Sequence, residues 1–391
     1  MNALLKPFVA AAAVLSCHAL AAPPLQLPPG CLLAQPGTCA YQPPLAYSTA
    51  NLDSILLDPA RNNHPVPFRI RYPVGAVGPL PVVVWNHGGG ATVWDRNAPG
   101  PLPISKGQQS SAEHGESFAS RGYVAIHIGR LPAENLTPSQ KQDCVTARLR
   151  FVPAGNPQAA FLERCSEFIG THIYGAQNVA FLMAALQAIQ AQFPNRFPVT
   201  MDFTRIVVGG WSGGSAVPLG IAGAFKQFNG LRVDAVTVPG VIGFIASSPR
   251  GTEWGDFESG FVDEFPEAPA PQVHSFQSID ARPFLAITGV SDRGKDKDAF
   301  LASRTAWFWS GTPGQKYQSY ALENSSTGGP VHGTMDLGEC GGSHAKYCRW
   351  FDALQMAYLD AVVKGLPLAV SWLASDAYRV LTRFQVELQR R

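Results

Sequence analysis

The chain has little net charge and few charged residues. Lysine and arginine number 30 against 28 aspartates and glutamates, the formal net charge is +2, and charged residues make up 15% of the sequence. No basic cluster is present, and nucleic-acid binding needs a basic surface that attracts phosphates. Because 46% of the residues are hydrophobic, intrinsic disorder is excluded as well. We expect a globular protein with a large core and no nucleic-acid partner.

Long apolar runs are also missing from most of the chain. After residue 22 no stretch reaches the roughly 18 apolar residues that a membrane-spanning helix needs. Lys6 precedes an apolar run that ends at residues 19–21, which is typical of a secretory signal peptide over residues 1–22. The sequence around Cys17 also allows a lipid anchor there. We expect a periplasmic or secreted protein with no stable membrane span.

Cysteine is scarce, and its spacing predicts disulfides. The chain has 7 cysteines, and one of them, Cys17, lies in the expected signal peptide. The others are even in number, which in an exported chain favours disulfide bonds. Short spacings favour the local pairs Cys31–Cys39, Cys144–Cys165 and Cys340–Cys348. Cys340, His344 and Cys348 are also spaced as metal ligands on one helical face. Because the surrounding segment is a poor helix and no fourth ligand is evident, we expect a disulfide and no metal.

Apolar runs alternate with helical patterns along the chain. Residues 80–86 and 123–128 are continuous apolar runs, as in buried parallel strands, and residues 174–191 have the pattern of a helix. Such alternation predicts an α/β protein with a mostly parallel, doubly wound sheet of about eight strands and helices on both faces. The other expected elements are strands near 68–73, 205–209, 234–247, 284–289 and 316–322 and helices near 115–121 and 352–364.

The predicted organisation is a single catalytic domain with an extension and an insertion. Residues 23–65 are rich in proline and polar residues and read as an extended lead-in, and residues 66–391 form the catalytic domain. Residues 131–170 lack clear periodicity, which indicates an inserted, lid-like segment. No internal repeat is visible.

Residues 205–216 carry the most informative pattern in the chain. A β-branched run ends in Gly-Trp-Ser-Gly-Gly at 210–214, the G-x-S-x-G pattern of a sharp turn between strand and helix that exposes one serine hydroxyl. The glycines beside Ser212 are needed because side chains there would collide with the strand or the helix. Pro218 falls early in the following helix, so we expect the first turn to absorb it or the helix to start irregularly.

A second glycine-rich motif predicts where a negative charge is stabilised. His-Gly-Gly-Gly at 87–90 follows the strand that ends near residue 86. Acyl transfer creates a negatively charged oxygen, which aimed backbone N–H groups stabilise. In this arrangement one donor follows the nucleophile, here Gly213, and the other comes from the glycine-rich loop. We predict Gly89 for the second donor.

A serine nucleophile needs a base and an orienting carboxylate, in the chain order serine, acid, histidine. The histidines after Ser212 are His274, His332 and His344. His332 lies in a glycine-rich, flexible loop after the expected last strand, so we predict it as the base; His344 is the alternative, and chain order disfavours His274. We predict Asp292, just after the strand at 284–289, as the acid. Its rivals are Asp296, Asp298, Glu253 and Asp263.

These features resemble the α/β-hydrolase family, and within it the dienelactone-hydrolase-like and platelet-activating-factor-acetylhydrolase-like branch. The resemblance spans roughly residues 65–365 and implies the fold, the triad Ser212, Asp292 and His332, and carboxylic-ester hydrolysis without a cofactor. Dienelactone hydrolases use a cysteine nucleophile, so their substrate is not implied. The matching stretches are Pro81–Gly90, Glu116–Val124, Arg205–Ala216, Pro283–Asp292 and the loop at His332.

Three functional classes remain open at this point. The favoured one is an exported serine esterase acting on a small-molecule or polymeric ester, and Trp211 before the serine is similar to secreted cutinase-like polyester hydrolases. A peptidase or amidase on the same fold and a non-catalytic binding protein are the alternatives. Trp211, Trp94 and Trp254 are candidate walls of an apolar substrate pocket. The acyl chain length and the oligomeric state are left open.

Overall fold

The structure is a computed structural model, and several of the predicted features lie outside the residues that it describes. Outside them are the signal peptide with Cys17, the pair Cys144–Cys165 and, apart from residues 138–139, the insertion at 131–170. The described residues are 24–44, 46–88, 94–95, 104–129, 138–139, 174–228, 231–233, 236–249, 273–292, 305 and 308–391.

A 9-stranded sheet organises the described part of the chain. Its strands are β1 (Thr49–Asp58), β2 (His64–Pro73), β3 (Leu80–Asn86), β6 (Val124–Ile128), β7 (Met201–Trp211), β10 (Val241–Ser247), β12 (Phe284–Gly289), β13 (Lys316–Ala321) and β14 (Val386–Arg390). Their order across the sheet is β1-β2-β6-β3-β7-β10-β12-β13-β14. Neighbours from β6 to β13 pair in parallel, whereas β1, β2 and β14 join antiparallel.

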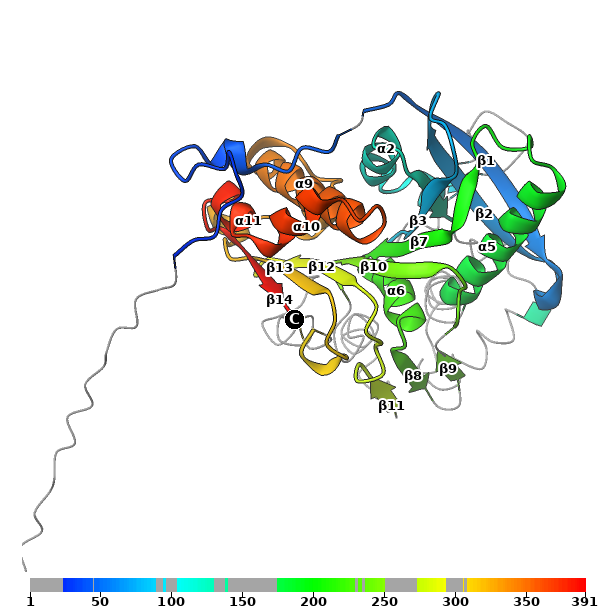
Figure 1. The fold of residues 1–391 in the computed structure, drawn as a ribbon. Helices are drawn as coiled ribbons and strands as arrows, with labels where there is room; N and C mark the ends of the chain where they lie inside the picture. Colours follow the sequence, from blue (N-terminus) through cyan, green and yellow to red (C-terminus); the bar gives the residue numbers. More distant parts are fainter. Residues whose placement is uncertain are drawn as a thin grey trace, which may run out of the picture.

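Helices cover both faces of this sheet (Figure 1). On one face lie α5 (Gly175–Gln192) and α6 (Ala216–Ile221), and on the other lie α2 (Ala112–Ser120), α9 (Ala345–Val362), α10 (Pro367–Ala374) and α11 (Ala377–Leu381). The shorter elements are α1 (Lys106–Gln109), η1 (Pro36–Cys39), η2 (Pro59–Arg61), η5 (Ser212–Ser215), η6 (Ser325–Thr327), η7 (His332–Asp336), η8 (Gly342–His344), β4 (Trp94–Asp95), β5 (Ile104–Ser105), β8 (Phe225–Phe228), β9 (Leu231–Val233) and β11 (Val273–Ser275). The predicted α/β arrangement with a mostly parallel sheet is confirmed.

The continuous apolar run of β3 follows from its place at the centre of the sheet. Side chains alternate between the two faces of a strand, and here each face is covered by helices. Val82 and Val84 belong to the core under α5 and α6, and Val83 and Trp85 to the core under α2 and α9–α11. Every position in β3 therefore needs an apolar or fully bonded side chain.

Two regions of the sheet differ from expectation. β1 lies in the segment for which the sequence predicts only an extended lead-in, and it pairs with β2 along its full length. β10 begins at Val241 rather than near residue 234, because Gly240 forms a turn with φ of +77°. A side chain at Gly240 would place its Cβ 1.9 Å from the carbonyl oxygen of Phe203, so this turn requires glycine.

Two of the three predicted disulfides, Cys31–Cys39 and Cys340–Cys348, are present and confirmed. The second bond removes both cysteines from the alternative metal site with His344, since a metal ligand must be a free thiolate. The N-terminal segment is also held by buried hydrogen bonds. Trp372 Nε1 donates to the carbonyl of Cys39 at 2.8 Å, and the Tyr41 hydroxyl donates to Asp360 at 2.7 Å.

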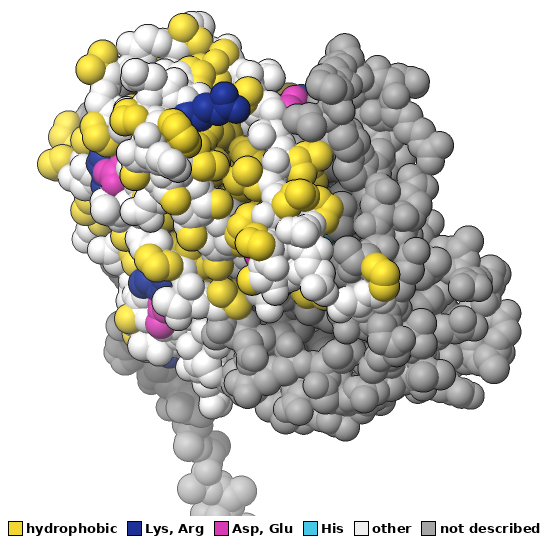
Figure 2. Space-filling model, turned by 90° about the vertical axis from the view of Figure 1, so that its right-hand side faces the viewer, with side chains coloured by type: hydrophobic (Ala, Val, Ile, Leu, Met, Phe, Trp, Pro, Cys, Tyr) yellow, Lys and Arg dark blue, Asp and Glu magenta, His cyan; other side chains and the backbone are white. Residues whose placement is uncertain are grey.

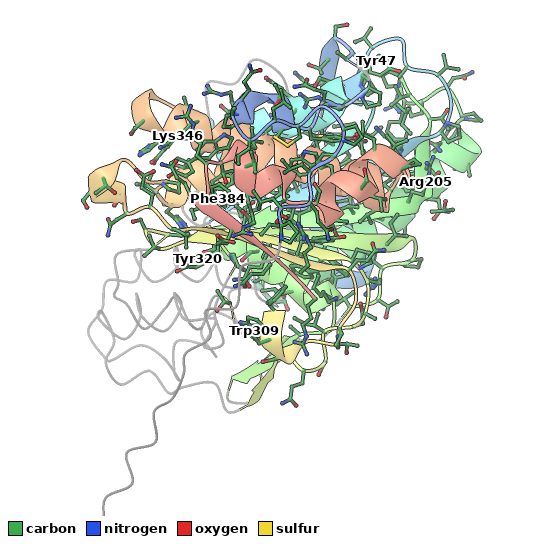
Figure 3. The ribbon with its side chains drawn as sticks, turned by 60° about the vertical axis from the view of Figure 1, so that its left-hand side comes forward. Tyr47, Arg205, Trp309, Tyr320, Lys346 and Phe384 are labelled. Carbon is green, nitrogen blue, oxygen red and sulfur yellow. A yellow bond between two sulfur atoms is a disulfide. The ribbon has the colours of Figure 1, made fainter. Side chains whose placement is uncertain are left out.

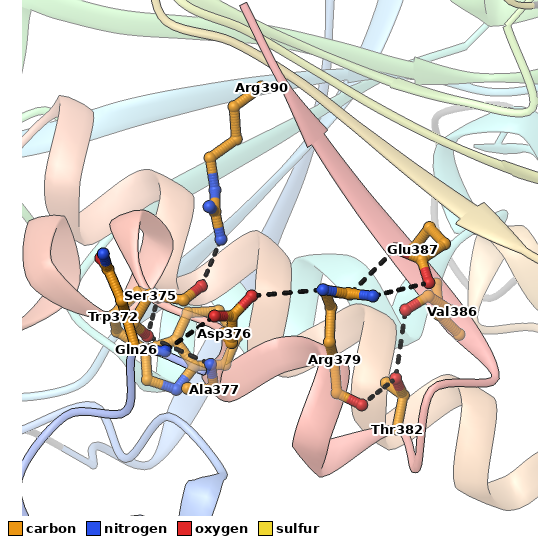
Figure 4. A network of polar contacts seen from close by, with 10 residues as sticks. All are labelled: Gln26, Trp372, Ser375, Asp376, Ala377, Arg379, Thr382, Val386, Glu387 and Arg390. Carbon is orange, nitrogen blue, oxygen red and sulfur yellow. Dashed lines mark hydrogen bonds and ion pairs between the residues drawn. The ribbon is translucent and has the colours of Figure 1, made fainter. Parts of the chain in front are cut away.

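Polar contacts join the N-terminal segment, α11 and the edge strand β14 (Figure 4). Asp376 accepts from the backbone N–H of Gln26 at 2.9 Å, and Gln26 in turn accepts from the backbone N–H of Asp376 at 2.7 Å. Arg379 lies between two carboxylates, 3.4 Å from Asp376 and 2.9 Å from Glu387. These bonds fix the C-terminal edge of the sheet against the helical layer.

The opposite edge of the molecule, seen in Figure 2, carries scattered hydrophobic side chains among few charged ones. In β1 and in the segment after β2, Leu52, Leu57, Val74 and Val77 are exposed. Isolated exposed apolar side chains are usual in soluble domains and need no special explanation. Among the described residues, no helix has both the length and the hydrophobicity to cross a membrane.

Three buried histidines predict a fold that loses stability in acid. Burial lowers the pKa of His64 from 6.5 to about 4, that of His114 to about 3, and that of His127 well below its ordinary value. Between pH 6.5 and about 4 the unfolded chain therefore binds protons that the folded chain does not. The free energy of unfolding is therefore highest above pH 6.5. As the pH drops below this value, it falls by about 1.4 kcal/mol per pH unit for each histidine.

One buried carboxyl group acts in the opposite direction. Burial raises the pKa of Asp336 well above 3.8. Its contribution to the free energy of unfolding is therefore complete at low pH and is lost as the pH rises. The histidines outnumber it, and we expect urea midpoints to fall steadily from pH 7 to pH 4.5. His64→Gln should flatten this dependence, because glutamine binds no proton in this pH range. A flat profile for the unmodified chain would contradict the prediction.

Candidate active site

Ser212 stands on the sharp turn that the sequence predicts. β7 ends at Trp211, and η5 begins with Ser212, whose φ of +51° is rare for a residue with a side chain. The hydroxyl of Ser215 donates to the carbonyl of Ser212 at 2.6 Å, which supports this strained backbone. Only 8% of Ser212 is exposed. Backbone strain at such a position is an observation from which a functional role can be inferred.

The glycines on either side of Ser212 are required by close backbone contacts, as predicted. A Cβ at Gly210 would lie 2.3 Å from the carbonyl oxygen of Gly214, and one at Gly214 would lie 2.1 Å from that of Asn86. Pro218 causes no conflict, because it falls in the first turn of α6, where the N–H has no partner in the helix. The helix also starts irregularly, through the 3₁₀ turn η5.

Asp292 and His332, from distant parts of the chain, meet beyond the end of β12. His332 Nδ1 lies 2.7 Å from Asp292 Oδ1. Asp292 is fully buried, whereas the His332 side chain is 26% exposed. When Nδ1–H donates to the carboxylate, the tautomer that forms has an unprotonated Nε2, which accepts protons. The pair therefore has the geometry of an oriented base.

Two hydroxyl groups that sequence reasoning missed hold the Asp292 carboxylate. Ser248 Oγ donates to Oδ1 at 2.7 Å and lies 2.9 Å from His332 Nδ1, and Thr288 Oγ1 donates to Oδ2 at 2.8 Å. Ser248 follows β10 with φ of +53°, a second strained serine. Hydrogen bonds of this kind stabilise a buried carboxylate and fix its orientation. A serine that simply follows a predicted strand carries no signal of this role.

Ser248 is expected to support the activity without contacting the reacting atoms. Ser248→Ala removes a hydrogen bond to a charged group, so we expect kcat of a reaction that uses the His332–Asp292 pair as its base to fall about 10-fold with KM nearly unchanged. The matched control is Ser247→Ala, because the neighbouring Ser247 hydroxyl is buried and has no hydrogen-bond partner among the described residues. Equal rates in both variants would show that Ser248 does not orient the carboxylate.

Trp211 links the serine turn to the histidine loop. Its ring packs on the His332 imidazole with 4.9 Å between centroids, and its Nε1 donates to the His332 carbonyl at 3.1 Å. The residue directly before Ser212 therefore contacts the predicted base. Within the described part of the chain no hydrogen bond joins the Ser212 hydroxyl to His332. Such bonds are often long in unliganded enzymes and shorten when substrate binds.

The loop that carries His332 is more firmly anchored than its glycine content predicts. His332 begins the 3₁₀ helix η7, and its last residue, Asp336, is buried. Ser111 Oγ lies 2.7 and 2.6 Å from the two Asp336 oxygens, and His114 Nε2 lies 3.5 Å from Oδ1. Burial raises the pKa of Asp336 and lowers that of His114. This buried polar cluster ties η7 to α2.

A cavity of about 420 Å³ opens beside the His332 imidazole. Its lining combines aromatic and apolar groups with hydroxyl, amide and carboxylate groups. A volume of this order admits a small organic molecule. The lining residues are Trp211, Ser291, Asn324, Ser325, Val331, His332, Gly333 and Glu339.

The other predicted site residues are placed only in part. Gly213 is buried in the serine turn, whereas Gly89 lies outside the described residues. Its neighbour Gly88 approaches the turn closely, since a Cβ there would lie 3.1 Å from Ser212 Cβ and 2.4 Å from the Trp211 ring. Trp94 lies in β4, but its side chain is outside the described part.

Of the rival acids and bases, only His344 has a side chain within the described residues. His344 ends η8, and its side chain forms no ion pair or hydrogen bond within the described residues. The side chain of His274, in β11, is outside the described part. Outside it as well are Glu253, Trp254, Asp263, Asp296 and Asp298.

The described residues define an α/β protein with a strained serine and an oriented histidine–aspartate pair at the carboxyl ends of its parallel strands. They contain no group of three or more histidines, cysteines or acids able to hold a metal ion. A comparison of the chain with protein-family models and with curated proteins finds no match. The functional assignment therefore depends on the geometry of the site.

Proposed function

We propose that the chain is an exported serine hydrolase with the α/β-hydrolase fold that cleaves carboxylic esters. The observation that carries the proposal is the 2.7 Å bond between His332 and Asp292, next to the tryptophan that precedes a serine with φ of +51°. The order of the parallel strands supports the fold, with the serine after β7 and the acid after β12. The two disulfides support export.

In the proposed mechanism, His332 takes the proton of Ser212 as the serine oxygen attacks the ester carbonyl. Asp292 stabilises the imidazolium that forms, and Ser248 and Thr288 keep its carboxylate in place. The N–H groups of Gly213 and Gly89 stabilise the negatively charged oxygen. His332 then protonates the leaving alcohol, and a water molecule activated by His332 hydrolyses the acyl-enzyme.

The proposal concerns esters rather than amides, and the side chain that acts as base can be tested by substitution. The purified chain should hydrolyse p-nitrophenyl butyrate faster than the matched p-nitroanilide. His332→Ala should lower kcat by about 1,000-fold or more, because no other described imidazole contacts Asp292. His344→Ala is the matched control and should retain full activity. If His344→Ala lost activity and His332→Ala kept full activity, the assignment of the base to His332 would be wrong.

A further inference from the structure

A second cavity, of about 460 Å³, lies among the N-terminal segment, the first turns of α9 and the turn before β14. It shares no lining residue with the cavity beside His332. We call it the basic cavity. Its lining residues are Pro36, Gly37, Ala40, Lys346, Arg349, Trp350, Ala353, Leu381, Arg383 and Gln385.

The basic cavity has positive charge that the described residues do not neutralise. Three of its lining side chains are cationic and none is acidic. Lys346 bonds to Glu323 at 3.0 Å and to Gln385 at 3.1 Å, but the guanidinium groups of Arg349 and Arg383 have no ion pair or hydrogen bond to any described residue. Nearby Arg379, by contrast, is held between Asp376 and Glu387 (Figure 4). Two cations therefore remain available for a ligand.

Aromatic and apolar side chains lie beside these cations, and Lys346 Nζ is 5.7 Å from the centroid of the Trp350 ring. Lys346, Arg349, Trp350 and Ala353 are spaced three, four and seven residues along α9, which places their side chains on one helical face. Trp350 is held edge-on by Tyr347, with ring centroids 5.0 Å apart. Figure 3 shows Lys346 at the start of α9 near Phe384, which directly precedes the lining residue Gln385. The cavity thus joins cationic groups to a flat apolar surface.

Both walls of the basic cavity are stiffened by disulfides. Cys31–Cys39 closes the loop that carries Pro36 and Gly37, and Cys340–Cys348 ties the first turns of α9 to the segment before it. The N-terminal wall is also held by the bond from Trp372 to the Cys39 carbonyl. Preorganised walls lose little entropy when a ligand binds.

We infer that the basic cavity binds a small aromatic carboxylate. A guanidinium group matches a carboxylate through two parallel N–H donors, and a ring packs against the indole of Trp350. The volume admits a single small molecule. The inference uses none of the residues of the proposed active site and holds whether or not the chain is an esterase.

The test measures binding of 4-fluorobenzoate to the full chain by fluorine NMR line broadening. Saturable binding is expected, with affinity lowered about 10-fold or more in Arg349→Gln/Arg383→Gln. The matched control is Arg196→Gln, since Arg196 is exposed after α5; it should bind as the unmodified chain does. Ser212→Ala should also bind normally, which separates this cavity from the proposed active site. Circular dichroism melting checks that each variant is folded.

Two further probes test the chemistry of the ligand. The neutral 4-fluorobenzyl alcohol should bind at least about 10-fold more weakly, because it lacks the charge that pairs with arginine. Inorganic phosphate should compete only weakly, because it has no ring to pack on Trp350. Unchanged binding in the double variant, equal binding of the alcohol, or phosphate competing as well as unlabelled benzoate would each overturn the inference.

Discussion

Ser212→Ala is expected to abolish ester hydrolysis, lowering kcat by about 10⁴- to 10⁶-fold. The substitution removes the only atom that forms the covalent intermediate in the proposed mechanism, and His332 then has no hydroxyl to activate. The backbone of the turn is retained, because alanine at φ of +51° is strained as serine is. The measurement is p-nitrophenyl butyrate turnover at saturating substrate, with melting curves to compare the folds.

A second substitution at the same position separates chemistry from stability. Ser212→Gly removes the hydroxyl and also relieves the backbone strain at φ of +51°, so it should be inactive yet more stable than Ser212→Ala by about 1 kcal/mol. The two variants should therefore differ in urea midpoint and not in activity. Residual activity near that of the unmodified chain in either variant would remove Ser212 from the mechanism.

Gly214→Ala is expected to have the largest effect on stability. Its Cβ would lie 2.1 Å from the carbonyl oxygen of Asn86 and 2.5 Å from that of His87, and both are backbone atoms of the central strand and the loop after it. Since neither side chain rotation nor solvent exposure can relieve the contact, β3 and the serine turn must separate. We expect a loss of about 3 kcal/mol or more in the free energy of unfolding, together with loss of activity.

Gly220→Ala is the matched control for this prediction. Gly220 lies in α6, a few residues further on, and a Cβ there would have no atom of the described residues within 4 Å beyond its chain neighbours and its own helix backbone. Alanine favours the helix, so this variant should gain about 0.5–1 kcal/mol and keep its activity. Similar urea midpoints for Gly214→Ala and Gly220→Ala would show that the close approach of the turn to β3 is not as described.

The central strands of the sheet were predictable because a strand that is buried on both faces has a continuous apolar sequence. β3 and β12 are continuous apolar runs, and the structure places them within a residue of the predicted bounds. β1 was missed because its leucines and isoleucine are interrupted by aspartates and a serine, as suits a half-exposed edge strand. Residues 377–390 carry α11 and β14, whose short lengths give too few residues for a periodic pattern.

The candidate site was predictable where chemistry constrains the chain locally. The glycines at 210 and 214 indicate a tight turn, because they have no side chain. The structure shows the backbone contacts that leave no room for one. Ser248, Thr288 and the Asp336–Ser111 contact were not predictable. Each depends on which segments become neighbours after folding, and a serine, threonine or aspartate near the end of an element is usually a turn or capping residue.

The most direct measurement of the proposed chemistry is labelling of the folded chain with a fluorophosphonate probe, followed by mass spectrometry of the modified peptide. An activated serine attacks this probe, and an ordinary surface serine does not. We predict a single label on Ser212 that is lost when His332 is replaced by alanine and retained when His344 is. Absence of labelling, or a label on another serine, would contradict a nucleophilic role for Ser212.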